Sequence, residues 1–274
     1  MISIILPVWN GSKFIDRAIA SVVAQTSSEW ELLIVDDGST DDSVEKIKRW
    51  QQLINQHFDE EKIRLFSTGM ANSGAQVGRN LAAEHARFEI LAYLDQDDLF
   101  FPRRIESILP FFKKGDYDLI FSPYEIFEKG RLYVWNLQAL WQKDSYVCSS
   151  EGDREPPFGV WARRRLQQVN LSVPLGVVNR KKIYEEVGGF QPGILIGSDG
   201  ILWRRMADRG ARIGFCPVIA GRYNVRPDSQ ARTKRPFSIG GIEIDKNHPL
   251  GSNGQYLDKE WFANLENKRK KVEA

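Results

Sequence analysis

The stretch LAYLDQDDLFFPRR, residues 91–104, places three carboxylates at the end of an apolar run. The run has the continuous hydrophobicity of a strand that is covered on both faces of a sheet. Asp95, Asp97 and Asp98 follow it directly, and Pro102 then suits the first turn of a helix. An acidic cluster is therefore expected where a buried strand ends.

The residues before this stretch alternate between strand and helix patterns. Apolar runs predict strands at 2–8, 31–37, 62–66 and 89–95. Apolar residues at helical spacing predict helices between them, at 14–23, from Asp41 and Asp42 to Ile54, and at 74–86. Because four buried strands alternate with helices, we predict an α/β fold with a mostly parallel central sheet flanked by helices.

The second half is less regular. We expect a helix over 102–112, a strand at 118–122 and a hairpin at 124–135. Further along, we expect a strand and a helix within 175–190, a helix from Asp199 to Gly210 and another strand within 211–225. The region 136–171 loses periodicity and is interpreted as a mobile or substrate-shaped insertion. Its tryptophans, with Trp135, suit either stacking on sugar rings or the core: Trp135, Trp141 and Trp161.

Composition narrows the functional classes. The 274 residues, with 42% hydrophobic content, suffice for a packed core, and a net charge of +2 argues against a nucleic-acid partner. Cys148 and Cys216 lie far apart, which favours a reducing, cytoplasmic location. No stretch approaches the ~20 apolar residues of a membrane span.

A second acidic pair, Asp36 and Asp37, follows the strand at 31–37. Ligands of open parallel sheets bind at the carboxyl ends of the strands, so both acidic clusters should lie on one rim. Their mutual repulsion is relieved by a hard divalent cation, Mn²⁺ or Mg²⁺, held with a phosphorylated ligand. Asp36 and Asp37 could instead cap the helix that begins near Asp41. The glycine motifs of dehydrogenases and P-loop enzymes are missing from the sequence.

Six motifs follow one another as far as about Asn224: LPVWNGSKFIDRAIASVVAQT, ELLIVDDGSTDDS, NSGAQVGRN, LAYLDQDD, VVNRKKIYEEVGGF and GSDGILWRRMADRG. Together they resemble family 2 of the inverting nucleotide-sugar glycosyltransferases, whose fold is called GT-A. The resemblance implies a GT-A domain over 1–226, with a nucleotide-binding half at about 1–100 and an acceptor half at about 101–226. Residues 227–274 form an extension, with a terminal helix expected at 257–271.

The resemblance also implies roles for single residues. The nucleobase pocket would be lined by Pro7, Val8 and Asp37, and the same donor site would include Asn10 and Asp36. Arg79 would lie near the base or phosphates, and Asp95 would lie at the ribose. Asp97 would bind the metal, and Asp199 would be the catalytic base. Residue chemistry leaves alternatives open. Arg79 could be an ordinary salt-bridge partner on a helix face, and Asp199 could be a first-turn carboxylate that complements the helix dipole.

Two positions depart from the family pattern. Ser198 stands where many relatives carry a glutamate before the base, and the stretch YNVRP places Arg226 where many carry a histidine near the metal. A metal ligand is thus missing, and Arg226 is expected to lie near the diphosphate instead. The motif of processive synthases is not found in the sequence, which favours transfer of one sugar per encounter.

The expected activity is inverting transfer from a nucleoside-diphosphate sugar, with UDP favoured, to a hydroxyl of a saccharide or lipid-linked saccharide in polysaccharide or glycoconjugate synthesis. A nucleotidyltransferase or a non-catalytic nucleotide-sugar-binding protein are the alternatives. A glycoside hydrolase explains neither the D-x-D arrangement nor Asp37. Basic residues at 163–165, Lys234, Arg235 and the end NKRKK suit either peripheral contact with an anionic membrane or a solvated surface.

Overall fold

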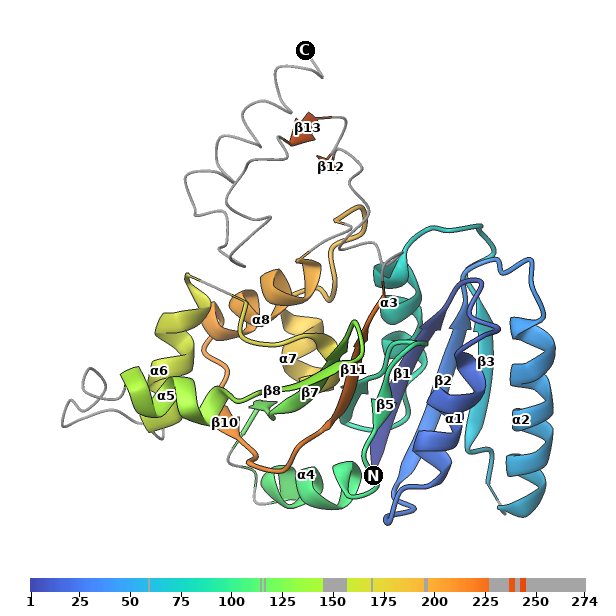
Figure 1. Cartoon of the computed structure of the whole chain (residues 1–274), viewed down its shortest axis with the longest axis horizontal. Helices are drawn as coiled ribbons and strands as arrows, with labels where there is room; N and C mark the ends of the chain where they lie inside the picture. The colour runs from blue at the N-terminus through green and yellow to red at the C-terminus, as the bar shows by residue number, and fades with distance from the viewer. Residues whose placement is uncertain are drawn as a thin grey trace.

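The computed structural model describes residues 1–58, 60–113, 115, 117–144, 157–168, 170–194, 197–226, 237–239 and 242–244. A seven-stranded sheet forms its centre, in the order β10-β6-β9-β4-β1-β2-β3. Figure 1 shows β1, β2 and β3 side by side at one edge of it. The strands are β1 (Ile2–Val8), β2 (Trp30–Asp36), β3 (Ile63–Ser67), β4 (Ile90–Tyr93), β6 (Leu119–Phe121), β9 (Val177–Arg180) and β10 (Ile213–Phe215). Strands β4, β1, β2 and β3 run parallel, as do β10 and β6, while β9 is antiparallel to both of its neighbours. The predicted mostly parallel sheet is confirmed.

Helices cover both faces of this sheet. One apolar layer contains buried side chains of α1 (Ile15–Val23), α2 (Ser43–His57) and α4 (Arg104–Lys113). The other contains those of α3 (Ala75–His85), α6 (Pro157–Leu166), α7 (Lys181–Glu186) and α8 (Ser198–Asp208). Strands β1 and β2 are buried at every position because they lie between the two layers. Continuous hydrophobicity in the sequence follows from this placement.

A smaller four-stranded sheet lies beside the first, in the order β5-β11-β7-β8. The hairpin expected at 124–135 is confirmed as β7 (Tyr124–Glu128) and β8 (Arg131–Trp135), which pair antiparallel. Strands β5 (Leu99–Phe100) and β11 (Gly221–Val225) pair closely at one end, where a Cβ on Gly221 would lie 2.0 Å from the Leu99 carbonyl oxygen. Only glycine permits this approach. It brings the end of β11 to the acidic loop after β4.

The region 136–171, interpreted from sequence as a mobile or substrate-shaped insertion, has regular structure in the part that is described, which the loss of periodicity did not predict. Helices α5 (Leu137–Asp144) and α6 occupy it, followed by the short 3-10 turn η2 (Pro174–Gly176). Trp161 is 3% exposed and belongs to the core, and Trp135 donates from Nε1 to the Leu171 carbonyl at 2.8 Å. Arg163, first of the basic run, donates from Nη2 to the Ala211 carbonyl at 2.7 Å. This arginine therefore fastens α6 to the segment after α8.

The extension beyond residue 226 lies mostly outside the described residues, including the expected terminal helix. Strands β12 (Phe237–Ile239) and β13 (Ile242–Ile244) are described there and pair with each other. Within the described ranges, none of the helices has the length and apolar character needed to cross a membrane.

Candidate active site

Loops at the carboxyl ends of β1, β2 and β4 meet on one rim of the large sheet, because β1 pairs with both other strands. Asn10 joins the first loop to the second: its N–H donates to Ser39 Oγ at 2.9 Å, and its Oδ1 accepts from the Thr40 N–H at 2.8 Å. Gln96 joins the first loop to the third, because its amide exchanges two hydrogen bonds with the Trp9 backbone at 2.9 and 3.1 Å. The two acidic clusters are therefore neighbours, as the strand pattern predicts.

Asp36 and Asp37 organise the loops that follow β2 and β3. The carboxylate of Asp36 accepts from the backbone of its own turn at 38–39, at 3.2–3.3 Å. Asp37, 3% exposed, accepts from Thr68 Oγ1 at 2.9 Å, from the Ser73 hydroxyl and from the Gly74 N–H at 2.8 Å. The alternative that the pair caps α2 is wrong, since these bonds lead elsewhere.

Pro7 and Val8 lie at the end of β1 with buried side chains. Helix α3 approaches Pro7 closely through Gly78, where an added Cβ would stand 3.3 Å from the proline Cβ. The carbonyl of Val8 accepts from the Asp37 N–H at 2.8 Å. Both residues thus form the packed base of the rim beside Asp37.

Arg79 extends from α3 toward the acidic loop and forms an ion pair with Asp95. It is 6% exposed, and its guanidinium lies 5.1 Å from the ring centroid of Phe190. Burial lowers the pKa of Arg79, but the negative charges of Asp95 and Asp199 outweigh this and raise its pKa above the usual value. Arg79 is a salt-bridge partner, as the alternative expects. Unlike an ordinary surface residue, it is buried, and its positive charge also interacts with Asp199.

The end of β11 closes over the acidic loop. Asn224 donates its N–H to Asp98 Oδ1 at 2.9 Å and its side-chain amide to the Asp97 carbonyl at 2.6 Å. Arg226 then places Nε 2.8 Å from Asp97 Oδ2 and its guanidinium 4.6 Å from the Phe14 ring centroid. Burial raises the pKa of Asp98 well above its usual range, and the charges of Asp97 and Asp95 raise it further. Asp98 therefore serves the fold of this loop.

The three acidic side chains do not form a cage for a metal. Among the described residues, no group of three or more His, Cys, Asp and Glu is arranged to hold a metal ion. Asp95 pairs with Arg79, Asp98 accepts from β11, and Asp97, with a side chain 16% exposed, pairs with Arg226 at the end of β11. Of the three, Asp97 is the carboxylate that the family resemblance assigns to a cation. One carboxylate fits a hard divalent ion that takes its other ligands from water and substrate phosphates.

Asp199 lies in the first turn of α8. Its Oδ2 accepts from Asn170 Nδ2 at 3.0 Å. Burial raises the pKa of Asp199, while the hydrogen bonds from Asn170 and the Gly200 N–H and the charge of Arg79 oppose the rise. The first-turn backbone does favour the charged carboxylate, as the helix-dipole alternative expects. That stabilisation and a catalytic role are compatible.

Helix α3 connects the two halves of the site. Gln76 donates to Ser198 Oγ at 3.1 Å and to the Ile194 carbonyl, so the start of α8 is fixed to the helix that carries Arg79. Sequence reasoning did not select Gln76, Gln96, Asn170 or Asn224. Their contacts join segments that are far apart in the chain. The presence of an amide side chain in the sequence does not indicate which distant residue it will bind.

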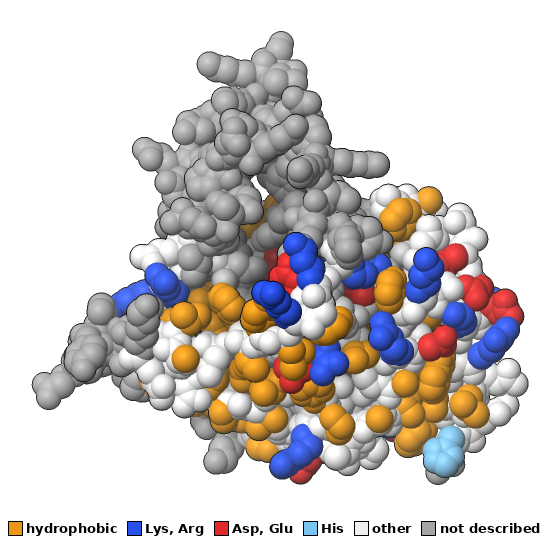
Figure 2. All heavy atoms as spheres, in the orientation of Figure 1, with side chains coloured by type: hydrophobic (Ala, Val, Ile, Leu, Met, Phe, Trp, Pro, Cys, Tyr) orange, Lys and Arg blue, Asp and Glu red, His pale blue; other side chains and the backbone are white. Residues whose placement is uncertain are grey.

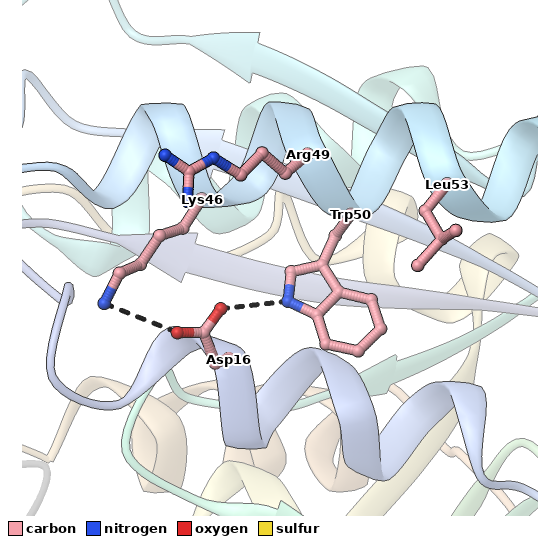
Figure 3. A pocket seen from close by; sticks show the side chains of 5 residues that line it. All are labelled: Asp16, Lys46, Arg49, Trp50 and Leu53. Atoms are coloured by element: carbon pink, nitrogen blue, oxygen red, sulfur yellow. Dashed lines mark hydrogen bonds and ion pairs between the residues drawn. The ribbon is translucent and has the colours of Figure 1, made fainter.

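A groove between α1 and α2 lies on the outer side of these helices (Figure 3). Asp16 accepts from Trp50 Nε1 at 3.0 Å and pairs with Lys46 at 3.4 Å. These polar groups of the groove therefore bind one another. Arg49 and Leu53 complete the lining. The face seen in Figure 2 mixes basic and acidic side chains without one basic patch. Neither feature adds to the site on the sheet rim.

Comparison with known proteins gives agreeing matches. The family model "Glycosyl transferase family 2" matches residues 3–185. The chain is 36% identical over 250 residues to the uncharacterized glycosyltransferase RC0461 of Rickettsia conorii, covering 89% of this chain and 36% of that protein. It is 32% identical over 126 residues to UDP-Glc:alpha-D-GlcNAc-diphosphoundecaprenol beta-1,3-glucosyltransferase WfgD of Escherichia coli, covering 46% of each chain.

A solved structure shows the same fold. The mannosyltransferase PcManGT from Pyrobaculum calidifontis, in complex with GDP-Man and Mn²⁺, aligns with a TM-score of 0.59 at 16% identity, over 84% of this chain and 58% of that chain. The chain spans less than half the length of the curated relatives named above. The predicted GT-A fold is confirmed.

Proposed function

The chain belongs to glycosyl transferase family 2, and from this premise we propose that it transfers one sugar from a nucleoside-diphosphate sugar to a hydroxyl of a saccharide acceptor, with inversion. One observation carries the proposal. A single rim brings together Asp97, the Arg79–Asp95 pair and Asp199. The positive charge of Arg79 interacts with the carboxylates of both Asp95 and Asp199. A donor platform and a candidate base are thus adjacent.

We assign the donor side to the loops after β1, β2 and β4. Asp37 already accepts three hydrogen bonds, and a carboxylate has about four acceptor positions, so one is left for a ring N–H of uracil. Asp95, 28% exposed at its side chain, can accept from a ribose hydroxyl while it stays paired with Arg79. UDP is the favoured nucleotide. WfgD, by its name, uses UDP-Glc, whereas the structure of PcManGT contains GDP-Man.

We assign Asp97 to a divalent cation, Mn²⁺ or Mg²⁺, held together with the diphosphate. When bound, such a cation would supply positive charge for the leaving diphosphate. This chain contributes two further cations at the rim, Arg79 and Arg226, and their guanidinium groups offer several donors to phosphate oxygens. Asp98 keeps the loop in place through Asn224.

Asp199 is the proposed general base. Its raised pKa makes the Asp199 carboxylate a better proton acceptor than that of an exposed aspartate. An acceptor hydroxyl that loses its proton to Asp199 attacks the anomeric carbon as the bond to the diphosphate breaks. Because attack comes from the face opposite the leaving group, the anomeric configuration inverts.

The acceptor is proposed to be a saccharide, either free or lipid-linked. WfgD, by its name, acts on a diphosphoundecaprenol-linked sugar, which supports the lipid-linked form. A cytoplasmic enzyme with peripheral contact to an anionic membrane would meet such an acceptor. Arg163 does not serve this contact, because it donates to the Ala211 carbonyl inside the fold.

The test is a donor screen. The purified chain is incubated with UDP-, dTDP- and GDP-sugars, with and without Mn²⁺, and thermal stabilisation and release of nucleoside diphosphate are recorded. A donor at 100 times its Kd should add about 2.7 kcal/mol to the free energy of unfolding. Stabilisation together with metal-dependent release of UDP supports the proposal. Stabilisation without turnover indicates the non-catalytic alternative, and release of pyrophosphate indicates a nucleotidyltransferase.

A further inference from the structure

Arg226 lies on the carboxylate that the proposed function assigns to the metal, and the inference here rests on that function. Nε of Arg226 is 2.8 Å from Oδ2 of Asp97, and both side chains are largely buried, with 23% and 16% exposure. The guanidinium also lies over the ring of Phe14 at 4.6 Å. One contact with a carboxylate and one with an aromatic ring thus hold Arg226 beside Asp97.

The backbone that leads to Arg226 is held in place by contacts of β11. Asn224 makes two hydrogen bonds to the acidic loop, at 2.9 and 2.6 Å, and Gly221 allows β11 to approach β5. An exchange of partners at Asp97 therefore involves the side chain of Arg226, while the strand stays in place. A long arginine side chain suits such an exchange, because the strand need not move with it.

Charge makes the arginine and a metal competitors. A guanidinium has five N–H donors and no lone pair, so Arg226 cannot become a metal ligand. A divalent cation on Asp97 would face the positive charge of Arg226 at short range, and like charges at such a distance repel. A diphosphate reverses the balance. Its oxygens accept from a guanidinium and also ligate the metal.

We propose that Arg226 and a divalent cation are alternative counter-ions of Asp97, and that the nucleoside diphosphate selects between them. Without nucleotide, Arg226 neutralises Asp97 and metal binds weakly. With nucleotide, the phosphate oxygens take up the guanidinium and Asp97 becomes available. Metal and nucleotide consequently bind together rather than in sequence with metal first.

The experiment measures Mn²⁺ bound to the full chain by the loss of the free-ion EPR signal, with no nucleotide and with UDP. Arg226→Gln should bind Mn²⁺ without nucleotide at least about tenfold more tightly than the wild type, because about 1.4 kcal/mol of lost competition corresponds to tenfold. Arg226→Lys keeps the positive charge and should remain close to the wild type. Arg222→Gln is the matched control, since Arg222 lies on β11, which ends just before Arg226, but pairs with Glu125 at 3.0 Å.

Three results would overturn the inference. The first is that Arg226→Gln binds Mn²⁺ no better than Arg222→Gln. The second is that the wild type binds UDP but binds Mn²⁺ equally well with and without it. The third is a gain in Arg226→Gln that survives a second change, Asp97→Asn. Circular dichroism checks that each variant is folded. Failure of the wild type to bind any nucleotide would count against the proposed function instead, because the Mn²⁺ titration without nucleotide tests the competition on its own.

Discussion

Asn170 donates from Nδ2 to Oδ2 of Asp199 at 3.0 Å, while its own Oδ1 accepts from the Ser172 N–H at 3.1 Å. The second bond fixes which end of the amide faces the carboxylate. Asn170 therefore holds the candidate base in one orientation and favours its ionised form, against the burial that raises the pKa of Asp199. A residue outside the recognised motifs thus acts on the proposed chemistry.

Asn170→Ala should shift the pH dependence of transfer. Loss of the donor raises the pKa of Asp199 further, so the base loses its proton only at higher pH. The acidic limb of kcat/KM should therefore move to higher pH, with a lower maximum. Asn136→Ala is the control, because Asn136 caps α5 through the Ala139 N–H at 3.1 Å. A lower rate with an unmoved limb would mean that Asn170 only supports the fold.

The large sheet could be predicted from sequence because strands that are buried on both faces have continuous apolar runs. Strand β2 is buried at every position and reads as one apolar run. Strand β5, Leu99–Phe100, is too short to have such a run, and it is a strand only through its pairing with β11. Helix α6 was missed because the basic run at 163–165 obscures its buried face, which includes Phe158 and Trp161.

The site divides in the same way. Neighbouring strand ends follow from topology, so the meeting of Asp37 with the acidic loop after β4 could be expected. The partners of these carboxylates could not. Arg226 reaches Asp97 only because β11 returns beside β5, and Asn170 reaches Asp199 only because the segment before η2 passes the start of α8. Such contacts depend on the packed fold, which no local pattern encodes.

Asp37→Ala should destabilise the protein as well as weaken nucleotide binding. The change leaves the buried Gly74 N–H, 2.8 Å from the carboxylate, without its acceptor, and an unsatisfied buried donor costs about 1–3 kcal/mol. Urea unfolding measures the free-energy change. Asp16→Ala, at the groove between α1 and α2, is the surface comparison. Equal stability of the two variants would show that Asp37 does not order the loop after β3.

Asp97→Asn should abolish the metal-dependent part of UDP binding. A neutral amide gives neither Arg226 nor a divalent cation its counter-charge. Calorimetry with and without Mn²⁺ should show metal-dependent affinity in the wild type and in Asp98→Asn, provided that variant folds, but none in Asp97→Asn. Metal-dependent binding that persists in Asp97→Asn would remove this residue from the metal site.

Asp199→Asn should stabilise the protein at neutral pH. The pKa of Asp199 is raised in the folded state, so the folded state holds the proton more tightly than the unfolded state. Its contribution to stability is present below the unfolded pKa of about 3.9 and is lost as pH rises through the folded pKa. A neutral amide avoids that loss. The variant should therefore melt higher than the wild type at pH 7, and the difference should shrink near pH 4.

The same substitution should lower turnover by ~10²-fold or more, the usual scale of a positioned proton transfer, while donor affinity stays within a few-fold. The two effects should separate because Asp199 lies at the start of α8, whereas the loops that we assign to the donor follow β1, β2 and β4. Rates of UDP release and UDP-sugar affinity are measured together, and NMR of the product gives its anomeric configuration. Asp208→Asn, at the other end of α8, controls for a general effect on the helix. Near-normal transfer by Asp199→Asn, or retention of configuration in the wild-type product, would rule out Asp199 as the base of a single displacement.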